Sequence, residues 1–357
     1  PIPGIPFLDG LYNIKVKDLD NGDHYIGQIK NGMFNGKGVM TFRNGATYQG
    51  DFVNDKKEGY GTLTQSNGNS YEGNFLNNEK HGTGNLRFIN GATIETKWDM
   101  GIRIFSSTHF TGELDDRGKY HGAGVLVTSN GQKIKGFWNH GGLEGDVEVT
   151  FGGGDLYKGK WKNGNRNGKG IRLDTDGQKY EGTFINGKLT GHGIKTWFNG
   201  DVYVGEFLDS VPNGYGIFTS AYDGFEQGEW ENGFLNGKGH KVKVNGDRYD
   251  GDFLKGQLHG IGAYTWNEGG SYEGQWKHNQ INGRGKYTWP NGSTYEGEYL
   301  YANRHGKGIA TYSNGSTYEG EFLNGYKNGK GIYTFADGTR HEVVFENNEL
   351  IDTALLD

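Results

Sequence analysis

The sequence has no cysteine, which excludes disulfide bonds, thiolate zinc sites and a thiol nucleophile. A chain without cysteine is compatible with a reducing compartment. No run of apolar residues approaches the ~18–20 that a membrane-spanning helix needs. An excess of positive charge is also lacking, because 37 Lys and Arg residues stand against 43 Asp and Glu, which gives a formal net charge of -6. We therefore expect no general attraction to nucleic acid or to an acidic membrane.

The N-terminal segment Pro1-Ile-Pro-Gly-Ile-Pro contains neither the basic nor the apolar region of a secretory signal peptide. It also lacks an initiator methionine. We therefore expect that the chain has been trimmed, with any targeting segment lost.

Aliphatic residues are few, whereas glycine and aromatic residues are plentiful. Of the 357 residues, 67 are Gly, a share well above the usual ~7%. Phe, Trp and Tyr make up 14% of the chain, and disordered chains generally lack such residues. We therefore expect an ordered protein whose buried contacts are aromatic rather than aliphatic.

A repeat of 23 residues runs through most of the chain. A fixed period of this size is typical of one small structural unit stacked many times. Its first position is occupied by Tyr25, Tyr48, Tyr71 and Ile94 and, after an interruption, by Ile134, Tyr157, Tyr180, Tyr203, Glu226, Tyr249, Tyr272, Tyr295, Tyr318 and His341.

The pattern within one repeat, numbered from this first position, predicts a β-hairpin. Glycine is usual at positions 3, 12 and 14, and aromatic residues are frequent at 5, 16 and 18. The resulting alternation has a period of two, which indicates strands rather than helix. Asn-Gly and Asp-Gly pairs favour tight hairpin turns. We expect no helix, with only the extreme C-terminus left open.

Glycines at positions 3, 12 and 14 are predicted to share a face with the aromatic residues. Because they have no side chain, they leave troughs in which rings can lie close to the backbone. In the clearest copy, Tyr318, Gly320 and Phe322 would form one aromatic slot. Successive slots would then form a ladder along the array.

The copy that begins at Tyr157 reads Tyr157-Lys-Gly159-Lys-Trp161-Lys-Asn163-Gly164-Asn-Arg-Asn-Gly168-Lys-Gly170. It resembles the MORN repeat (membrane occupation and recognition nexus), whose core reads Y-x-G-x-[FW]-x-N-G-x-x-x-G-x-G. The resemblance covers roughly residues 25–345, in some fourteen or fifteen full or partial units. This family forms elongated, twisted, single-layer arrays of β-hairpins. The resemblance therefore implies an all-β fold of the same kind.

The regularity of the repeat divides the chain into segments. Between Ile94 and the next aromatic-Gly pair, Phe110-Thr-Gly112, the spacing is 16 residues instead of 23. We interpret this irregular region as a bend or joint, with a functional pocket as the alternative. The segments are a lead-in or partial repeat at 1–24, regular repeats at 25–93, irregular repeats at 94–156, regular repeats at 157–341 and a C-terminal cap or tail at 342–357.

One regular repeat lacks its tyrosine, because Glu226 stands at the first position. Phe225 and Tyr222 are the two candidates to fill this slot.

The motifs that would indicate catalysis or metal binding have plainer interpretations. Gly-Lys-Gly segments such as Gly306-Lys307-Gly308 lie within a strand and are followed by no Ser or Thr, so they are not P-loops. Histidines such as His259 and His305 stand where other repeats have Asn, which favours a role as polar turn residues. We find no nucleophile elbow, zinc motif or EF-hand loop. We therefore expect no enzyme, no catalytic residue, no metal and no cofactor.

Position 15 faces away from the slots and is often aliphatic. A stripe of β-branched residues there either reflects strand propensity or forms a docking surface for a second copy or another protein. The candidate residues of this partner face are Ile171, Ile194, Ile217, Ile309 and Ile332.

Charged residues form rows on the face opposite the slots, with lysine frequent at position 13 and glutamate, such as Glu273, Glu296 and Glu319, at position 2. They either pair across strands as a solvated charge ladder or bind anionic lipid headgroups, as the family name suggests. The densest basic patch, and the candidate lipid site, comprises Lys158, Lys160, Lys162, Arg166, Lys169 and Arg172.

Together these observations favour a non-catalytic scaffold that mediates protein–protein interaction. The resemblance implies a cytoskeletal or ciliary/flagellar assembly, an intracellular, cytoplasmic location, and self-association as an antiparallel homodimer. One alternative is a peripheral membrane module that binds anionic phospholipids. Another is the accessory repeat region of a larger enzyme. Nucleic acid is not expected as a partner.

Overall fold

The computed structural model describes residues 6–8, 11–104 and 108–356. In these residues the chain forms 31 β-strands and one 3-10 helix, η1 (Pro6–Leu8). No helix within these ranges has the length and apolar surface needed to cross a membrane. The all-β prediction is confirmed, and the C-terminal residues that the sequence left open form a strand.

The chain divides into two compact units, Pro1–Lys188 (unit 1) and Leu189–Asp357 (unit 2). In unit 1, consecutive strands pair antiparallel in chain order, in one sheet of β1–β9 and a second that begins at β10. Its strands are β1 (Ile14–Asp18), β2 (His24–Lys30), β3 (Met33–Thr41), β4 (Thr47–Val53), β5 (Lys56–Thr64), β6 (Ser70–Leu76), β7 (Glu79–Arg87), β8 (Thr93–Asp99), β9 (Ile102–Ile104), β10 (His109–Leu114), β11 (Tyr120–Val127), β12 (Lys133–Asn139), β13 (Gly142–Thr150), β14 (Leu156–Lys162), β15 (Asn165–Leu173) and β16 (Lys179–Ile185).

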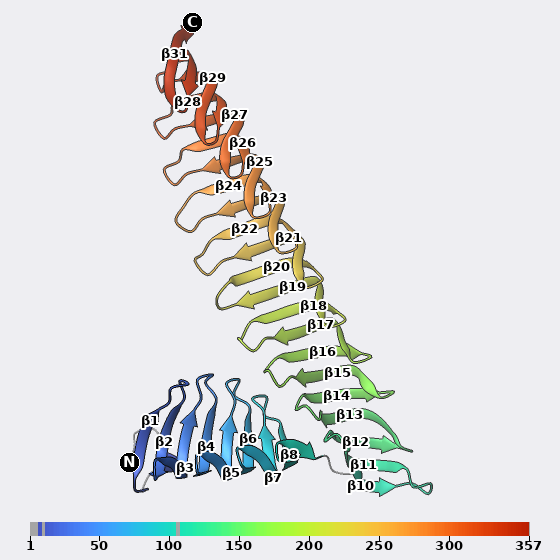
Figure 1. Ribbon diagram of the computed structural model, residues 1–357. Helices are drawn as coiled ribbons and strands as arrows, with labels where there is room; N and C mark the ends of the chain where they lie inside the picture. Colours follow the sequence, from blue (N-terminus) through green and yellow to red (C-terminus); the bar gives the residue numbers. More distant parts are fainter. Residues whose placement is uncertain (1–5, 9–10, 105–107, 357) are drawn as a thin grey trace. The chain divides into compact units, whose positions relative to one another are not determined.

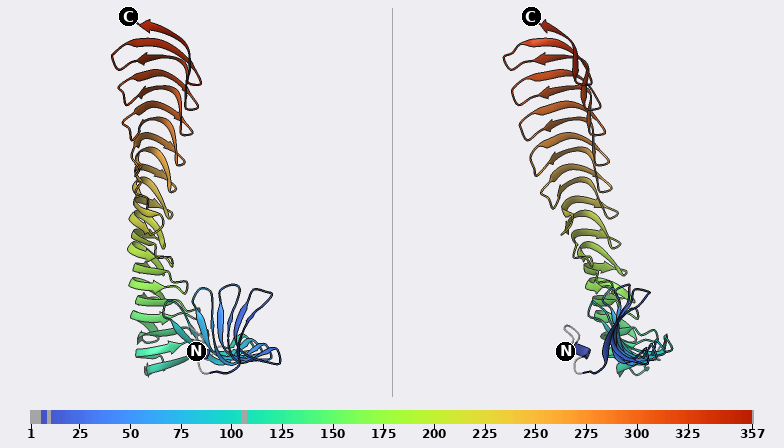
Figure 2. Two further views of the ribbon diagram at one scale, coloured as in Figure 1. Left: turned by 90° about the vertical axis from the view of Figure 1, so that its left-hand side faces the viewer. Right: turned by 60° about the vertical axis from the view of Figure 1, so that its left-hand side comes forward.

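The strands of unit 2 also pair antiparallel in chain order, and they form a single layer (Figures 1 and 2). They are β17 (Lys188–Thr196), β18 (Val202–Leu208), β19 (Val211–Ser220), β20 (Gly224–Glu231), β21 (Phe234–Val242), β22 (Arg248–Leu254), β23 (Gln257–Thr265), β24 (Ser271–Lys277), β25 (Gln280–Thr288), β26 (Thr294–Leu300), β27 (Asn303–Thr311), β28 (Thr317–Leu323), β29 (Tyr326–Thr334), β30 (Arg340–Glu346) and β31 (Glu349–Leu356).

Each repeat is a hairpin closed by a two-residue turn at positions 7 and 8. In the β28–β29 hairpin, Asn324 and Gly325 have φ angles of 51° and 91°. Two successive left-handed residues are what a type I′ turn requires, and Asn-Gly favours this turn. A second turn leads to the next hairpin, where the Gly338 N–H donates to the Phe335 carbonyl (2.9 Å). Both kinds of turn were expected from the Asn-Gly and Asp-Gly pairs.

The tyrosine at position 1 lies across the glycines at positions 3 and 14. A β-carbon on Gly320 would stand 2.5 Å from Cζ of Tyr318, and one on Gly331 would stand 2.7 Å from the same atom. The Tyr318 hydroxyl donates to the Glu321 carbonyl (3.2 Å). The predicted slots are therefore present. The same arrangement recurs at the buried tyrosines Tyr25, Tyr48, Tyr71, Tyr157, Tyr203, Tyr249, Tyr272 and Tyr295.

Rings of neighbouring slots meet edge to face and form the ladder. The Tyr318 ring contacts Phe322 in its own hairpin and Phe345 in the next, each at a centroid distance of 5.3 Å. Such pairs contribute ~0.5–1.5 kcal/mol beyond the area that they bury. The core is thus one row of rings, in which each repeat is stabilised mainly by its neighbours.

Glycine at position 12 does not share the aromatic face, so this part of the prediction was wrong. A β-carbon on Gly329 would meet the Glu321 side chain, which lies on the face opposite the slots. The strand register shifts between Gly320 and Phe322, and such a bulge breaks the two-residue alternation on which the prediction depended. Gly329 has a φ of 93°, so glycine is needed there for its backbone conformation.

The slot at Glu226 is filled by neither Phe225 nor Tyr222. Leu235 is buried, and its methyl groups are the side-chain atoms nearest to a β-carbon placed on either paired glycine of this repeat, Gly228 or Gly239. Glu226 instead pairs with Lys241 (2.5 Å). Leu235 stands at position 10, where an aliphatic side chain can reach the empty trough from the other strand of the hairpin.

Basic side chains cover several slots from position 10. Lys327 Nζ lies 5.3 Å from the ring centroid of Tyr318 and 4.3 Å from that of Phe345, within the range of a cation–π contact. Burial lowers the pKa of Lys327. The sequence pattern did not identify this contact, because the bulge decides which face position 10 takes.

The irregular segment 94–156 contains the break between the two sheets of unit 1. The first sheet ends with β9, the second begins with β10, and residues 105–107 lie outside the described part. Thr96, which replaces a slot glycine, is buried and donates to the Gly84 carbonyl (3.0 Å). Across the break, Asn90 Nδ2 donates to the Gly154 and Leu173 carbonyls (3.2 Å each).

Candidate functional site

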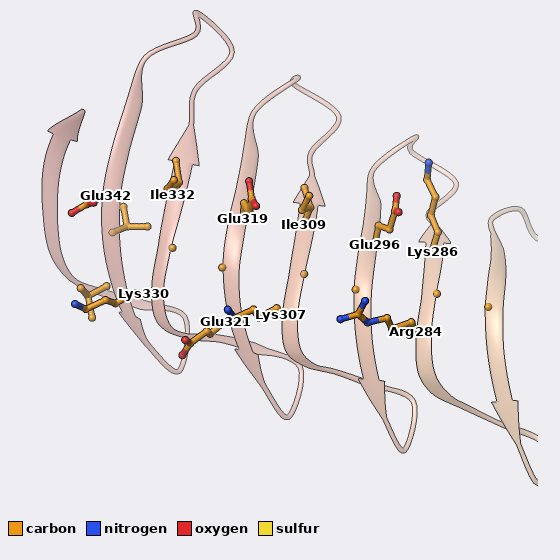
Figure 3. Close-up of a pocket in the computed structure, with 18 of the residues that line it drawn as sticks. Arg284, Lys286, Glu296, Lys307, Ile309, Glu319, Glu321, Lys330, Ile332 and Glu342 are labelled. Atoms are coloured by element: carbon orange, nitrogen blue, oxygen red, sulfur yellow. The ribbon is translucent and has the colours of Figure 1, made fainter. Parts of the chain in front are cut away.

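A groove of about 1260 Å³ runs along the face of unit 2 that lies opposite the aromatic slots, over strands β23–β31. Its floor is formed by paired glycines such as Gly297 and Gly308, or Gly320 and Gly331. Tyrosine rings cover the other side of these glycines, so on the groove side only backbone is present. Side chains of positions 15 and 2 rise along one wall, and those of positions 13 and 4 rise along the other (Figure 3).

The first wall, called the isoleucine–glutamate row, alternates residues of positions 15 and 2. Ile309 lies between Glu296 and Glu319 in the strand register, and Ile332 lies between Glu319 and Glu342. Ile309 is 42% exposed. From β24 to β30 the row comprises Glu273, Lys286, Glu296, Ile309, Glu319, Ile332 and Glu342.

The second wall, called the charge-pair row, alternates residues of positions 13 and 4. Arg284 pairs with Glu298 (3.6 Å), and in the preceding part of unit 2 Lys238 pairs with Asp252 (2.6 Å). The same cross-strand pairing occurs in unit 1 between Lys37 and Asp51, and between Lys160 and Asp146. The solvated charge ladder considered from the sequence is therefore present in part, and its ion pairs use positions 13 and 4.

The glutamates of position 2 were expected to contribute to the same ladder, but they stay outside it. Within residues 189–356, the carboxylates of Glu273, Glu296, Glu319 and Glu342 form no ion pair or hydrogen bond and are exposed. Their cross-strand neighbours are isoleucine and alanine, except for Lys286 beside the first two.

Only two of the predicted partner-face residues lie in the groove. Ile309 and Ile332 line it. Ile194 and Ile217 belong to a second apolar patch of unit 2, where both lie opposite Val204 in the register. Val204 is 46% exposed. Ile171 lies in unit 1, on β15, where it is opposite Lys158 and Glu181.

The predicted basic patch is divided between the two faces of unit 1. Arg166 reaches the aromatic side, where its guanidinium lies 5.7 Å from the ring centroid of Phe184 and burial lowers its pKa. Arg172 is also on that side, 5.5 Å from the Tyr180 centroid, and it pairs with Asp174 (2.5 Å).

Four cations of the predicted patch remain on the other side, and two of them are neutralised. Lys158 pairs with Glu148 (2.7 Å) and Lys160 with Asp146 (2.9 Å). These acids come from the preceding strand β13, which the spacing within one repeat does not show. Lys162 and Lys169 form no ion pair with the residues that the structure describes.

Within the described ranges, no group of three or more His, Asp and Glu side chains is placed to hold a metal ion. The repeat histidines lie close to one another only in pairs, such as His259 and His278 with ring centroids 5.3 Å apart. What the geometry offers is a long groove with apolar and acidic side chains on one wall.

Comparison with known proteins identifies the repeat. The family model described as MORN repeat matches twelve segments that together exceed half of the chain: 25–47, 48–70, 71–93, 116–133, 157–179, 180–202, 203–221, 227–248, 249–271, 272–294, 295–317 and 318–340. No curated relative matches the sequence.

Similar solved structures are only distantly alike. The TCP10 domain of Danio rerio CPAP is 9% identical, with 76% of this chain and 98% of that chain covered and a TM-score of 0.20. Virginiamycin B lyase from Staphylococcus aureus is 10% identical, with 87% and 88% covered and a TM-score of 0.14. At TM-scores this low, the likeness supports no statement on fold or function.

Proposed function

The chain belongs to the MORN-repeat family, and from this premise we propose that it is a non-catalytic scaffold whose unit 2 binds protein partners in the groove on β23–β31. The observation that carries the proposal is the exposed apolar side chain of Ile309 beside the groove floor, together with the half-buried Ile332 at the same position one hairpin later. Apolar side chains gathered along a groove are typical of interaction sites.

We propose a cytoskeletal or ciliary assembly as the setting. The resemblance to MORN-repeat proteins implies that setting, and an assembly scaffold needs a docking surface that extends over several repeats. The groove meets this need because it is lined by residues from Ile261 to Ala354.

The double variant Ile309→Lys/Ile332→Lys is expected to lose most of its partner binding. Covering an isoleucine contributes up to about 1.5–3 kcal/mol, so placing a charge at two such contacts should lower partner affinity at least about tenfold. The measurement is the fraction of tagged chain that stays with the detergent-insoluble cytoskeleton of cells that express it.

The matched control is Leu323→Lys/Tyr326→Lys, which places the same charges at the turn of the β28–β29 hairpin. Both residues are exposed there, and neither lines the groove. Circular dichroism should show unchanged β content in both variants. Wild-type retention of the groove variant, or equal loss in the control, would refute the groove as the docking site.

Two other occupants are distinguished with the same proteins. If a second copy of the chain is the partner, light scattering should show a wild-type mass above 39.5 kDa that falls in a variant of the groove or of the Ile194–Ile217 patch. If anionic lipid is the partner, the chain should float with phosphoinositide vesicles, and charge reversal at Lys162 and Lys169 should abolish flotation.

A further inference from the structure

The glutamates of the isoleucine–glutamate row form no ion pair within residues 189–356, although Lys286 lies between Glu273 and Glu296 in the register. Glu319 lies between two isoleucines, and Glu342 lies between Ile332 and Ala354. The groove lining as a whole holds more acidic than basic side chains. A partner segment that enters the groove therefore gains from carrying cations on the side that faces this row.

The spacing of these glutamates restricts the conformation of such a segment. Successive members of the row are one repeat, or two strands, apart. Neighbouring strands lie ~4.8 Å apart, so the glutamates recur about every 9.6 Å along the groove. Four of them, from Glu273 to Glu342, span about 29 Å.

A polyproline II helix matches this spacing. It rises ~3.1 Å per residue with three residues per turn, so every third residue faces the same way at intervals of about 9.3 Å. Over three intervals its mismatch with the row is only about 1 Å. A β-strand with the same residue spacing would turn every second cation away from the row, because its side chains alternate.

An α-helix fits less well. It rises ~1.5 Å per residue, so residues seven apart recur about every 10.5 Å, and the mismatch grows to roughly 3 Å over three intervals. A helix with side chains is also ~10–12 Å wide, whereas the row of isoleucines stands directly beside a floor of bare glycine backbone. A narrow, extended segment can reach that floor.

We infer that the groove of unit 2 binds a basic, extended segment of a partner protein in the polyproline II conformation, with a lysine or arginine at every third residue. Each cation faces one glutamate among Glu273, Glu296, Glu319 and Glu342. The residues between the cations pack on Ile309 and Ile332, and proline suits these places because it is apolar and holds the backbone near this conformation. The inference rests on the proposed function, since it specifies the partner chemistry of the same groove.

The test uses the full chain and a synthetic peptide of four Lys-Pro-Pro units, with affinity measured by calorimetry at low salt. One control peptide has the same composition with all lysines in a single block. A second control is a helical peptide with lysine at every seventh residue. Because each exposed ion pair contributes ~0.2–1 kcal/mol, the loss of alignment in the block peptide should weaken binding about tenfold.

The double variant Glu296→Gln/Glu319→Gln should weaken binding of the periodic peptide by about two- to fivefold for each glutamate. Its matched control is Glu346→Gln/Glu349→Gln, which removes the same charge at the turn of the β30–β31 hairpin, where the two residues pair in the register outside the groove lining. The control should change affinity less than twofold.

Several results would overturn the inference: equal binding of the periodic and block peptides, tighter binding of the helical peptide, or equal affinity of the wild-type chain and the Glu296→Gln/Glu319→Gln variant. If Ile309→Lys/Ile332→Lys abolishes cytoskeletal retention while the periodic peptide does not bind the wild-type chain, the proposed function stands and this inference is wrong. If retention and peptide binding both fail to depend on the groove, both are wrong.

Discussion

A Gly320→Val variant is expected to lose the packing of the β28–β29 hairpin. The new β-carbon would stand 2.5 Å from Cζ of Tyr318 and 2.8 Å from Cα of Gly331. The ring alone cannot relieve this overlap, because the second contact is with backbone. Overpacking commonly costs ~1–3 kcal/mol, and we expect the upper end of that range. Since repeats are stabilised mainly by their neighbours, hydrogen exchange should rise at residues 295–341.

Gly153→Val in unit 1 is the control for this change. A β-carbon on Gly153 meets no atom within 4 Å, and its φ is not left-handed. This variant should therefore keep wild-type exchange around its own position. Unchanged exchange at 295–341 in Gly320→Val would contradict the packing of tyrosine rings on glycine backbone.

Raising the pH from about 10 to 12 is expected to unfold the tyrosine ladder. Burial raises the pKa of Tyr272, Tyr295 and Tyr318 from 10.0 to about 12 in the folded chain. When folding raises the pKa of a phenol, the contribution of that phenol to stability is fully present at any pH below its pKa in the unfolded chain. That contribution is lost as the pH rises through the interval between the two values.

Near pH 11, this linkage removes about 1 kcal/mol for each of these tyrosines, or roughly 3–4 kcal/mol for the three adjacent repeats. Such a loss is comparable with much of the stability of a small domain. The measurement is the free energy of unfolding by circular dichroism over this pH range.

The triple variant Tyr272→Phe/Tyr295→Phe/Tyr318→Phe is the control for the alkaline transition. It loses hydroxyl hydrogen bonds to backbone carbonyls, so it should be less stable at neutral pH. Its stability should nevertheless fall less steeply between pH 10 and 12, because fewer buried phenols can ionise. Identical pH slopes in both proteins would show that the buried hydroxyls do not govern the transition.

The repeat and its slots could be predicted from sequence because their determinants are local. Tyr318, Gly320 and Phe322 alternate within one strand, and the Asn324-Gly325 pair marks the turn of the same hairpin. Most repeats present the same determinants, so the period and the alternation reinforce one another. The face of position 15, with Ile309 and Ile332, followed from the same alternation.

Features that depend on the bulge or on a neighbouring repeat could not be predicted in this way. The bulge after Gly320 reverses the expected side of Gly329 and decides where Lys327 lies. Lys158 and Lys160 looked like free cations, because the acids that pair with them belong to the preceding strand. The groove requires two rows of side chains beside a strip of bare backbone, which is a property of the folded sheet.

The claim that partners dock in the groove of unit 2 is tested most directly by site-specific photo-crosslinking in cells. A photoreactive residue placed at Ile309 projects from the groove wall, whereas one placed at Tyr326 projects from the hairpin turn of the next repeat. Both native side chains are exposed, so both probes are accessible. We predict a discrete partner cross-linked from position 309 and none from position 326. The same partner cross-linked from 326 and not from 309 would contradict the account.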